Sequence, residues 1–228
     1  MDDTSLLAAF QLADSFFPSG MVTFSHGLET FMSVAAESEV DIARVLDDYL
    51  SGKIAPSDLV AYAHAYRAAA AGDDERLQAI DCFLTATLLS QELRQASARS
   101  GRALLDTLRP TIDDAVFQHF VHAVHARRSD GNAPVCLGLL CAVWNIPLRA
   151  GALLHLYTFA VSFLGAALRL GRLGHREAQK ILLALRPRLS PLVDLALERD
   201  LEELSTFAPL ADIRAMQHAF LPVRLFAS

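Results

Sequence analysis

Three histidines with helical spacing are the residues best placed to do chemistry. His119, His122 and His125 follow one another at intervals of three. Neighbouring pairs would share a helix face, but six residues turn the helix too far for all three to meet one ion. A firm metal site requires three or four ligands, so a polar stripe is the favoured interpretation. A metal-binding helical enzyme that uses the His119/His122 face stays open as the alternative, and His26 is a further weak candidate for a metal ligand.

The patterns of common catalytic sites are missing from this sequence. It contains no G-x-x-x-x-G-K-[ST] phosphate loop, no G-x-S-x-G nucleophile turn and no H-E-x-x-H zinc pattern. Ser25 precedes His26 directly, but adjacent residues on a helix do not face each other. The residues therefore give no positive indication of an enzyme or of a resident cofactor.

Composition indicates one folded domain. The 228 residues are 53% hydrophobic and 20% charged, enough to bury a core. The net charge of −6 argues against a nucleic-acid binder, which usually carries a basic face. Asp2 and Asp3 stand where a signal peptide would be basic, so a cytoplasmic protein is expected. Cys82, Cys136 and Cys141 form no C-x-x-C pair and are expected to be reduced and buried.

Two uncharged stretches raise the question of a membrane. Residues 131–148 and 150–168 carry no formal charge, and the second is just long enough to span a bilayer. Pro134 and Pro147 interrupt the first stretch, and His155 and Thr158 dilute the second. A central helix buried on all sides has the same composition, so we expect a core helix and no membrane.

Helical periodicity dominates the chain. Apolar residues recur at threes and fours, as at Ile112, Val116, Phe120 and Val124, and no stretch alternates with period two. The pattern predicts helices near 5–17, 25–36, 41–52, 56–71, 74–88, 90–107, 112–127, 135–145, 148–171, 175–186, 190–204 and 210–219. Turn signals separate them, with a break at 186–187 and an N-cap at Ser190. The predicted fold is an all-α, single globular bundle around the apolar helix 148–171.

The C-terminus is unusually apolar. Termini are usually polar and mobile, yet this one places Leu221, Leu225 and Phe226 around Arg224. Apolar residues with an arginine are typical of interface anchors. We therefore divide the chain into a domain over 1–204 and a tail over 205–228 that docks on its own domain or on a partner.

Five short motifs, taken in order, resemble one protein family. They are Gln-Leu-Ala-Asp-Ser at 11–15 with Pro-Ser-Gly at 18–20 and Ser-His-Gly-Leu-Glu at 25–29; Glu92, Arg94, Ala96, Ser97 and Gly101; Pro134, Val135 and Gly138; Arg-Leu-Gly at 169–171 with Gly174; and His218, Arg224, Leu225, Phe226 and Ser228. Each motif is weak alone, but together they span the chain. The sequence resembles the urease accessory protein UreF family.

The resemblance implies a function without catalysis. Members of the family are all-α, cytosolic and dimeric, and are not enzymes themselves. They bridge the accessory protein UreD, called UreH in some systems, and the GTPase UreG. The complex inserts nickel into apo-urease with GTP hydrolysis by UreG, so nickel and GTP belong to the complex and the chain has no cofactor of its own. An adaptor for some other GTPase is the alternative that only the family match removes.

The resemblance also implies where partners dock. In the family, the C-terminal tail orders when UreD/UreH binds and helps to build the UreG platform, and the loop after the first helix makes a second contact. The partner-binding residues expected here are Pro18, Gly20, Val22, Ser25, Gly27, Leu28, Glu29, His218, Arg224, Leu225 and Phe226.

Overall fold

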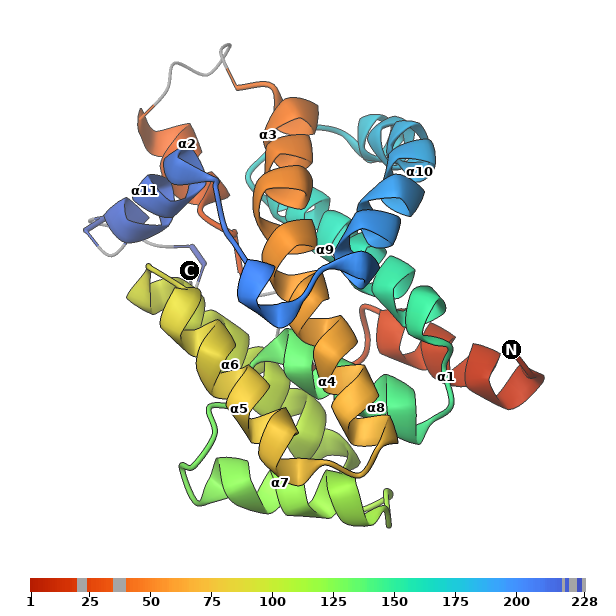
Figure 1. The fold of residues 1–228 in the computed structure, drawn as a ribbon. Coiled ribbons are helices and arrows are strands. Elements are labelled where there is room, and N and C mark those ends of the chain that lie inside the picture. Colours follow the sequence, from red (N-terminus) through yellow and green to blue (C-terminus); the bar gives the residue numbers. More distant parts are fainter. Residues whose placement is uncertain (20–23, 35–39, 219, 222–224, 227–228) are drawn as a thin grey trace.

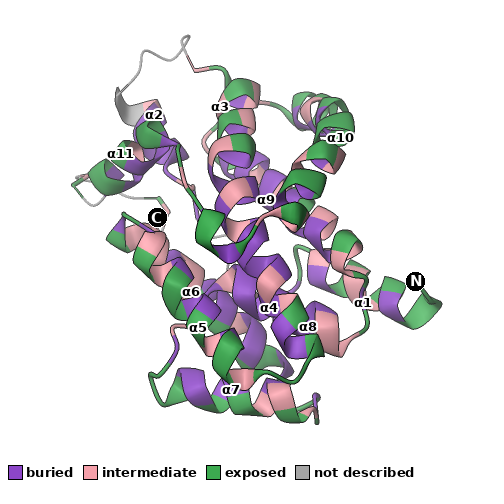
Figure 2. Cartoon of the chain, in the orientation of Figure 1, coloured by how far each residue is buried: buried purple, intermediate pink, exposed green. Residues whose placement is uncertain are grey.

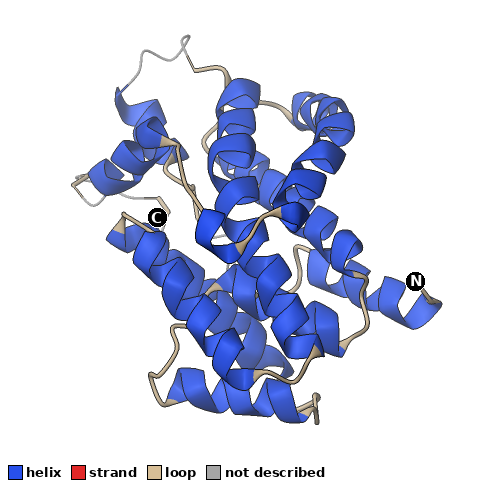
Figure 3. Cartoon of the chain, in the orientation of Figure 1, coloured by secondary structure: helices blue, strands red, loops and turns tan. Residues whose placement is uncertain are grey.

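The computed structural model describes residues 1–19, 24–34, 40–218, 220–221 and 225–226. Every regular element in these ranges is a helix (Figure 3). They are α1 (Asp3–Ala13), α2 (Leu28–Val34), α3 (Ile42–Tyr49), η2 (Leu50–Leu59), α4 (Val60–Ala70), α5 (Asp74–Thr87), α6 (Gln91–Leu108), α7 (Ala115–His125), α8 (Ala133–Val143), α9 (Leu148–Arg169), α10 (His175–Glu198), η3 (Leu201–Glu203) and α11 (Pro209–His218). The prediction of an all-α, single-body fold is confirmed.

The apolar helix α9 runs through the middle of the bundle, as predicted (Figure 1). It contacts α1, α2, α3, α4, α8, α10 and η2. The short helix α8 is buried along most of its length and crosses α4 closely. At the crossing, a Cβ on Gly138 would lie 2.6 Å from the Tyr62 carbonyl oxygen, so only glycine fits there. Buried residues concentrate along these helices in Figure 2.

By its length and composition, α9 is also a candidate for a membrane-spanning helix. In its most apolar 18-residue window, 56% of the residues are buried inside the protein. The core helix of a bundle meets the same criteria. The length and hydropathy of α9 are therefore weak evidence for a membrane.

The predicted break between helices 175–186 and 190–204 is wrong, because α10 continues through Pro187 and Pro191. A proline inside a helix removes one hydrogen bond and costs about 3 kcal/mol. Both prolines are exposed, so water can reach the carbonyl groups that lose their donors. On the opposite face, the leucines at 182, 185 and 189 are buried in the core. Tertiary packing of these buried leucines outweighs the free-energy cost of the two prolines.

A π-helix, η2, joins the two helices that the sequence predicts at 41–52 and 56–71. Pro56 lies inside it, where the wider turn accommodates a residue that cannot donate. The segment after η3 runs along this element. Ser205 N donates to the Pro56 carbonyl at 3.1 Å, and Phe207 N donates to the Gly52 carbonyl at 2.8 Å.

A buried ion pair connects η2 to the C-terminal helix. Lys53 Nζ lies 3.0 Å from Asp212 Oδ1, and both side chains are more than nine-tenths buried. The segment beyond residue 204 therefore packs on the bundle at least as far as His218. The division of the chain at 204 stays a prediction.

One buried carboxylate organises the loop between α7 and α8. Asp81 on α5 accepts hydrogen bonds from Ser129 Oγ and from the backbone N–H groups of residues 130, 131 and 132, all at 2.7–2.8 Å. The side-chain amide of Asn132 donates to it as well, at 2.9 Å. These bonds satisfy the donors of the second half of the loop, where residues 129, 131 and 132 are buried.

Candidate partner-docking site

The loop after α1 is shaped by its own side chains. Helix α1 begins after Asp2, whose carboxylate caps Ser5 N at 2.7 Å, and ends before Asp14. Asp14 Oδ1 then accepts from Phe16 N at 2.9 Å, which turns the chain. Phe17 packs into the core while Phe16 is 92% exposed. Pro18 is also exposed. The predicted contacts Gly20 and Val22 lie outside the described residues.

The Ser-His-Gly sequence before α2 makes a tight corner. His26 and Gly27 both have positive φ angles, 53° and 78°. A Cβ on Gly27 would approach the Tyr49 hydroxyl to 3.1 Å and the Ala215 backbone nitrogen to 3.4 Å. The Tyr49 hydroxyl donates to the His26 carbonyl. The corner thus brings the start of α2 against α11, as seen in Figure 1.

A cluster of Glu29, Glu92 and His218 lies where α2, α6 and α11 meet. His218 is fully buried, and its Nε2 lies 2.9 Å from Glu29 Oε2. Its Nδ1 lies 2.9 Å from Glu92 Oε2. The side chains of Glu29 and Glu92 are 9% and 14% exposed. One imidazole thus bridges two almost buried carboxylates.

Glu29 also holds the end of the chain. Its Oε1 accepts from Leu225 N at 2.7 Å, and its Oε2 lies 3.3 Å from Phe226 N, which donates to it. The Phe226 ring then lies 4.9 Å from the guanidinium carbon of Arg169 at the end of α9. Burial lowers the pKa of Arg169. The N-terminal motif and the C-terminal tail, predicted as separate contacts, are therefore parts of one cluster.

Exposure divides the predicted partner-binding residues into two groups. Pro18 and Leu225 are exposed, with Leu225 at 74%, and Phe226 is half-buried. Ser25, Gly27, Leu28, Glu29 and His218 are buried. Members of the second group support the surface from below and do not form it in this conformation. Arg224 lies outside the described residues.

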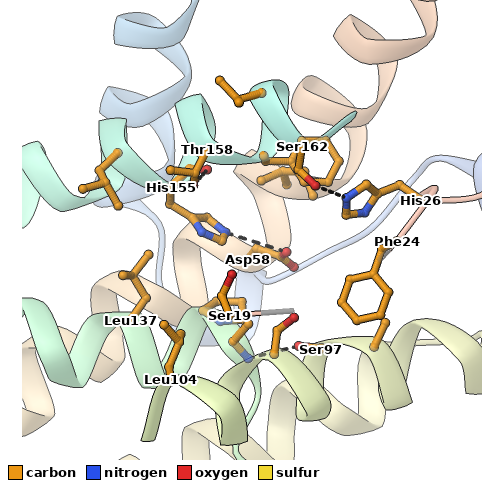
Figure 4. Close-up of a pocket in the computed structure, with 18 of the residues that line it drawn as sticks. Ser19, Phe24, His26, Asp58, Ser97, Leu104, Leu137, His155, Thr158 and Ser162 are labelled. Atoms are coloured by element: carbon orange, nitrogen blue, oxygen red, sulfur yellow. Dashed lines mark hydrogen bonds and ion pairs between the residues drawn. The ribbon is translucent and has the colours of Figure 1, made fainter. Parts of the chain in front are cut away.

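Behind this corner is a cavity of about 330 Å³, shown in Figure 4. Its walls come from α6, α8, α9, η2 and the loop after α1, and apolar and polar side chains both line it. His26 Nε2 lies 3.2 Å from Ser162 Oγ, and the imidazole packs 4.7 Å from the Phe159 ring centre. On the far wall, His155 Nε2 lies 3.9 Å from Asp58 Oδ2. Ser19 and Ser97 add hydroxyl groups between them, so polar groups lie at several points of the cavity wall.

Burial dominates the electrostatics of His26. It lowers the pKa of the imidazole to about 4, although the carboxylate of Asp58 opposes the shift, and Arg169 adds to it. His26 is therefore neutral near pH 7. A neutral imidazole can ligate a metal, but the described residues contain no group of three His, Cys, Asp or Glu side chains suited to one.

The histidines of α7 are on the surface. His119 Nδ1 lies 2.8 Å from Asp74 Oδ2, whereas His125 Nε2 lies 2.8 Å from Asp106 Oδ1. His122 is exposed. The two paired histidines thus engage carboxylates on different helices, and the His119/His122 face does not gain a third ligand within the described part of the chain. Of the cysteines, Cys136 and Cys141 are buried as predicted, but Cys82 is exposed.

Glu92 in the cluster and Arg169 beside the tail carried no predicted role. Glu92 lies in the first turn of α6, where an acid is ordinarily explained by the helix dipole. Arg169 lies in the last turn of α9, where a base has the same explanation. Both residues belong to the short motifs on which the family resemblance rests, and this was the only signal in the sequence that could have identified them.

Comparison with known proteins tests the family resemblance. The model of the UreF family matches residues 36–186, about two thirds of the chain. A urease accessory protein UreF from Trichodesmium erythraeum is 36% identical over 237 aligned positions, which cover all of this chain and 98% of that protein. The chain belongs to the UreF family. UreF 1 from Brucella melitensis is 33% identical over 97% of the chain, and a UreF from Yersinia enterocolitica is 26% identical over its full length.

The similarity to the Trichodesmium protein extends over both the corner at 25–29 and the tail at 218–228, because that alignment covers the whole chain. The UreF family model stops at residue 186, before α11. The contacts of α11 and the tail therefore come from the structure itself.

Proposed function

We propose that this chain is the adaptor of a cytoplasmic urease maturation complex. It binds UreD/UreH and the GTPase UreG, and the complex inserts nickel into apo-urease with GTP hydrolysis by UreG. The chain acts by positioning the GTPase and has no catalytic residue, metal or cofactor of its own. Membership in the UreF family supports this role.

The observation that carries the proposal is the meeting of the N-terminal corner with the C-terminal tail. Glu29 accepts hydrogen bonds from the backbone of Leu225 and Phe226, so the buried corner fixes the position of the tail above it. Two large apolar side chains of the tail itself, Phe220 and Leu225, are exposed, at 87% and 74%. Large exposed apolar side chains gathered in one region are typical of protein–protein interfaces.

Docking at this surface explains why so many motif residues are buried. Ser25, Gly27 and Leu28 fix the backbone of the corner, and His218 fixes the carboxylate that holds the tail. Binding of a partner to Leu225 and Phe226 thus depends on how the whole cluster positions the tail. Two copies of the chain, joined as a homodimer, would hold two GTPase subunits in a fixed relation.

Size-exclusion chromatography with light scattering tests the proposal. The chain, at 24.8 kDa per copy, is mixed with its cognate UreD/UreH and UreG. Wild type should form one assembly with two copies of each protein. Leu225→Asp should lose a partner, because it places a charge in the apolar surface, whereas Leu183→Asp should not. Leu183 is a matched control, 61% exposed on α10.

Equal assembly by Leu225→Asp and wild type would contradict docking at the tail. Absence of any assembly with folded wild-type protein would contradict the adaptor role as a whole.

A further inference from the structure

We infer that the cavity behind the corner is a binding site for a small uncharged molecule with an apolar body and a hydroxyl group, which bridges His155 and Asp58. Such a site goes beyond the proposed function, because it requires no partner protein. Three features of the cavity wall support it: polar atoms without a hydrogen bond, charges that cancel, and apolar side chains around them.

Two buried polar atoms of the cavity wall lack a hydrogen bond to the described residues. They are Nε2 of His155 on α9 and Oγ of Ser100 on α6. The two residues are 7% and 3% exposed, so bulk water does not reach them freely. Buried polar atoms are almost always hydrogen-bonded, and one that is left unsatisfied lowers stability. Their missing partner is therefore a polar group that enters the cavity.

His155 and Asp58 are placed to share one oxygen atom. His155 Nε2 lies 3.9 Å from Asp58 Oδ2, which is too far for a direct hydrogen bond. The imidazole points from α9 toward the carboxylate (Figure 4). An oxygen atom about 2.8 Å from each of the two atoms fits between them. A hydroxyl group suits this position, because it can donate to the carboxylate while it accepts from an imidazole N–H group.

The charges of the cavity wall favour an uncharged ligand. The acidic side chains in the wall are Asp14 and Asp58, and the basic ones are Lys53 and Arg169, so their formal charges cancel. Burial lowers the pKa of His26 to about 4, which leaves that imidazole neutral near pH 7. A charged ligand would lose its hydration without gaining an opposite net charge in the wall.

Buried apolar side chains favour a ligand with a carbon body over water alone. Leu104 on α6, Leu137 on α8 and Phe159 on α9 belong to the wall, and they are 7%, 6% and 5% exposed. The volume of about 330 Å³ is far more than one bridging water needs. Water beside such side chains finds few hydrogen bonds, so an apolar group that replaces it is favoured. Apolar walls with a few placed polar groups are typical of small-molecule sites.

Titration of the free chain with 4-propylphenol, followed by NMR of the histidine ring protons, tests the site. Binding should be saturable and should shift the ring protons of His155. In 4-propylanisole a methoxy group replaces the hydroxyl and cannot donate to Asp58, so its affinity should be lower by about tenfold or more. The amine 4-propylbenzylamine, which is a cation at pH 7, should also bind more weakly than the phenol.

Two variants locate the binding within the cavity. Asp58→Asn should weaken the binding of 4-propylphenol by about tenfold and leave that of 4-propylanisole unchanged, because only the phenol donates to the carboxylate. Asp113→Asn, at an exposed position outside the cavity wall, is the matched control. Leu137→Trp should abolish the binding of both compounds, because the larger side chain fills the cavity. Circular dichroism verifies that each variant is folded.

Three results would overturn the site: no saturable binding of 4-propylphenol to folded wild type, equal affinity for the phenol and the anisole, or tighter binding of the amine. An equal loss of both neutral compounds in Asp58→Asn would overturn the bridging role of the carboxylate. Because no partner protein is present, these results are separate from a failure of the adaptor to assemble.

Discussion

Replacing Lys53 by methionine should release α11 from the bundle. The substitution keeps most of the aliphatic side chain but leaves Asp212 as a buried charge without its cation. Breaking one partner of a buried ion pair typically costs about 3–5 kcal/mol. The docking equilibrium of α11 should therefore shift by about a hundredfold to a few thousandfold, at 1.4 kcal/mol for each factor of ten.

Apart from the contacts of His218 with Glu29 and Glu92, little in α11 can offset that cost. Its buried apolar residues are Ala211 and Ala215, and its buried polar residues are Asp212 and His218. A buried methyl group contributes about 0.8 kcal/mol, so the two alanines are small beside the lost ion pair. Asp212 reaches water most easily if α11 leaves the bundle. We thus expect local release and not global unfolding.

Hydrogen exchange over residues 209–218 measures the release, and urea denaturation measures global stability. Lys53→Met should strongly accelerate the exchange of α11 and change the global free energy of unfolding much less. Lys180→Met is the matched control, since Lys180 is exposed on α10. In the double variant Lys53→Met/Asp212→Leu, no charge remains to be buried, and most of the protection should return. Unchanged exchange of α11 in Lys53→Met would refute the reasoning.

Three further predictions concern the core and the corner. Asp81→Asn should lower the free energy of unfolding by about 3–5 kcal/mol, because an amide cannot accept from all the loop donors. In the same urea titration, the control Asp113→Asn at an exposed position should stay within about 0.5 kcal/mol of wild type. Gly138→Ala should lower the free energy of unfolding by about 1–3 kcal/mol through overpacking against α4. In the control Gly165→Ala, the added methyl group meets only the end of an arginine side chain at 3.9 Å, so the stability measured by thermal denaturation should be unchanged or higher. Because the pKa of His26 is lowered to about 4, the stability that neutral His26 contributes is present above pH 6.5 and lost as pH falls toward 4. In urea titrations across that range, His26→Gln should flatten this part of the pH dependence of the unfolding free energy. The same pH dependence in wild type and His26→Gln would contradict the lowered pKa.

Much of the fold could be predicted from local pattern. The period of three to four predicted the helices, and the uncharged run at 150–168 predicted the central one. What the pattern missed depended on neighbours in space. Pro187 and Pro191 look like a helix end, and only the burial of the opposite face explains why α10 continues. The π-helix η2 likewise depends on what packs on it, since its carbonyls accept from the segment that follows η3.

The site was less accessible to sequence reasoning. The resemblance selected Glu29 and His218, but it could not tell that both are buried and that they touch each other. Glu92 is 126 positions away from His218 along the chain, and no local periodicity links such a pair. The histidines of α7 had the clearest spacing, yet His119 and His125 contact separate surface carboxylates. Spacing identifies a shared helix face, whereas a site requires convergence of several elements.

The central proposal is tested most directly by the nickel content of urease. Purified apo-urease is incubated with UreD/UreH, UreG, GTP and nickel, with and without this chain, and the nickel bound per active site is measured after removal of free metal. We predict efficient loading only when the chain is present, and reduced loading with Leu225→Asp but not with Leu183→Asp. Equal loading in the absence of the chain would contradict its role as the adaptor.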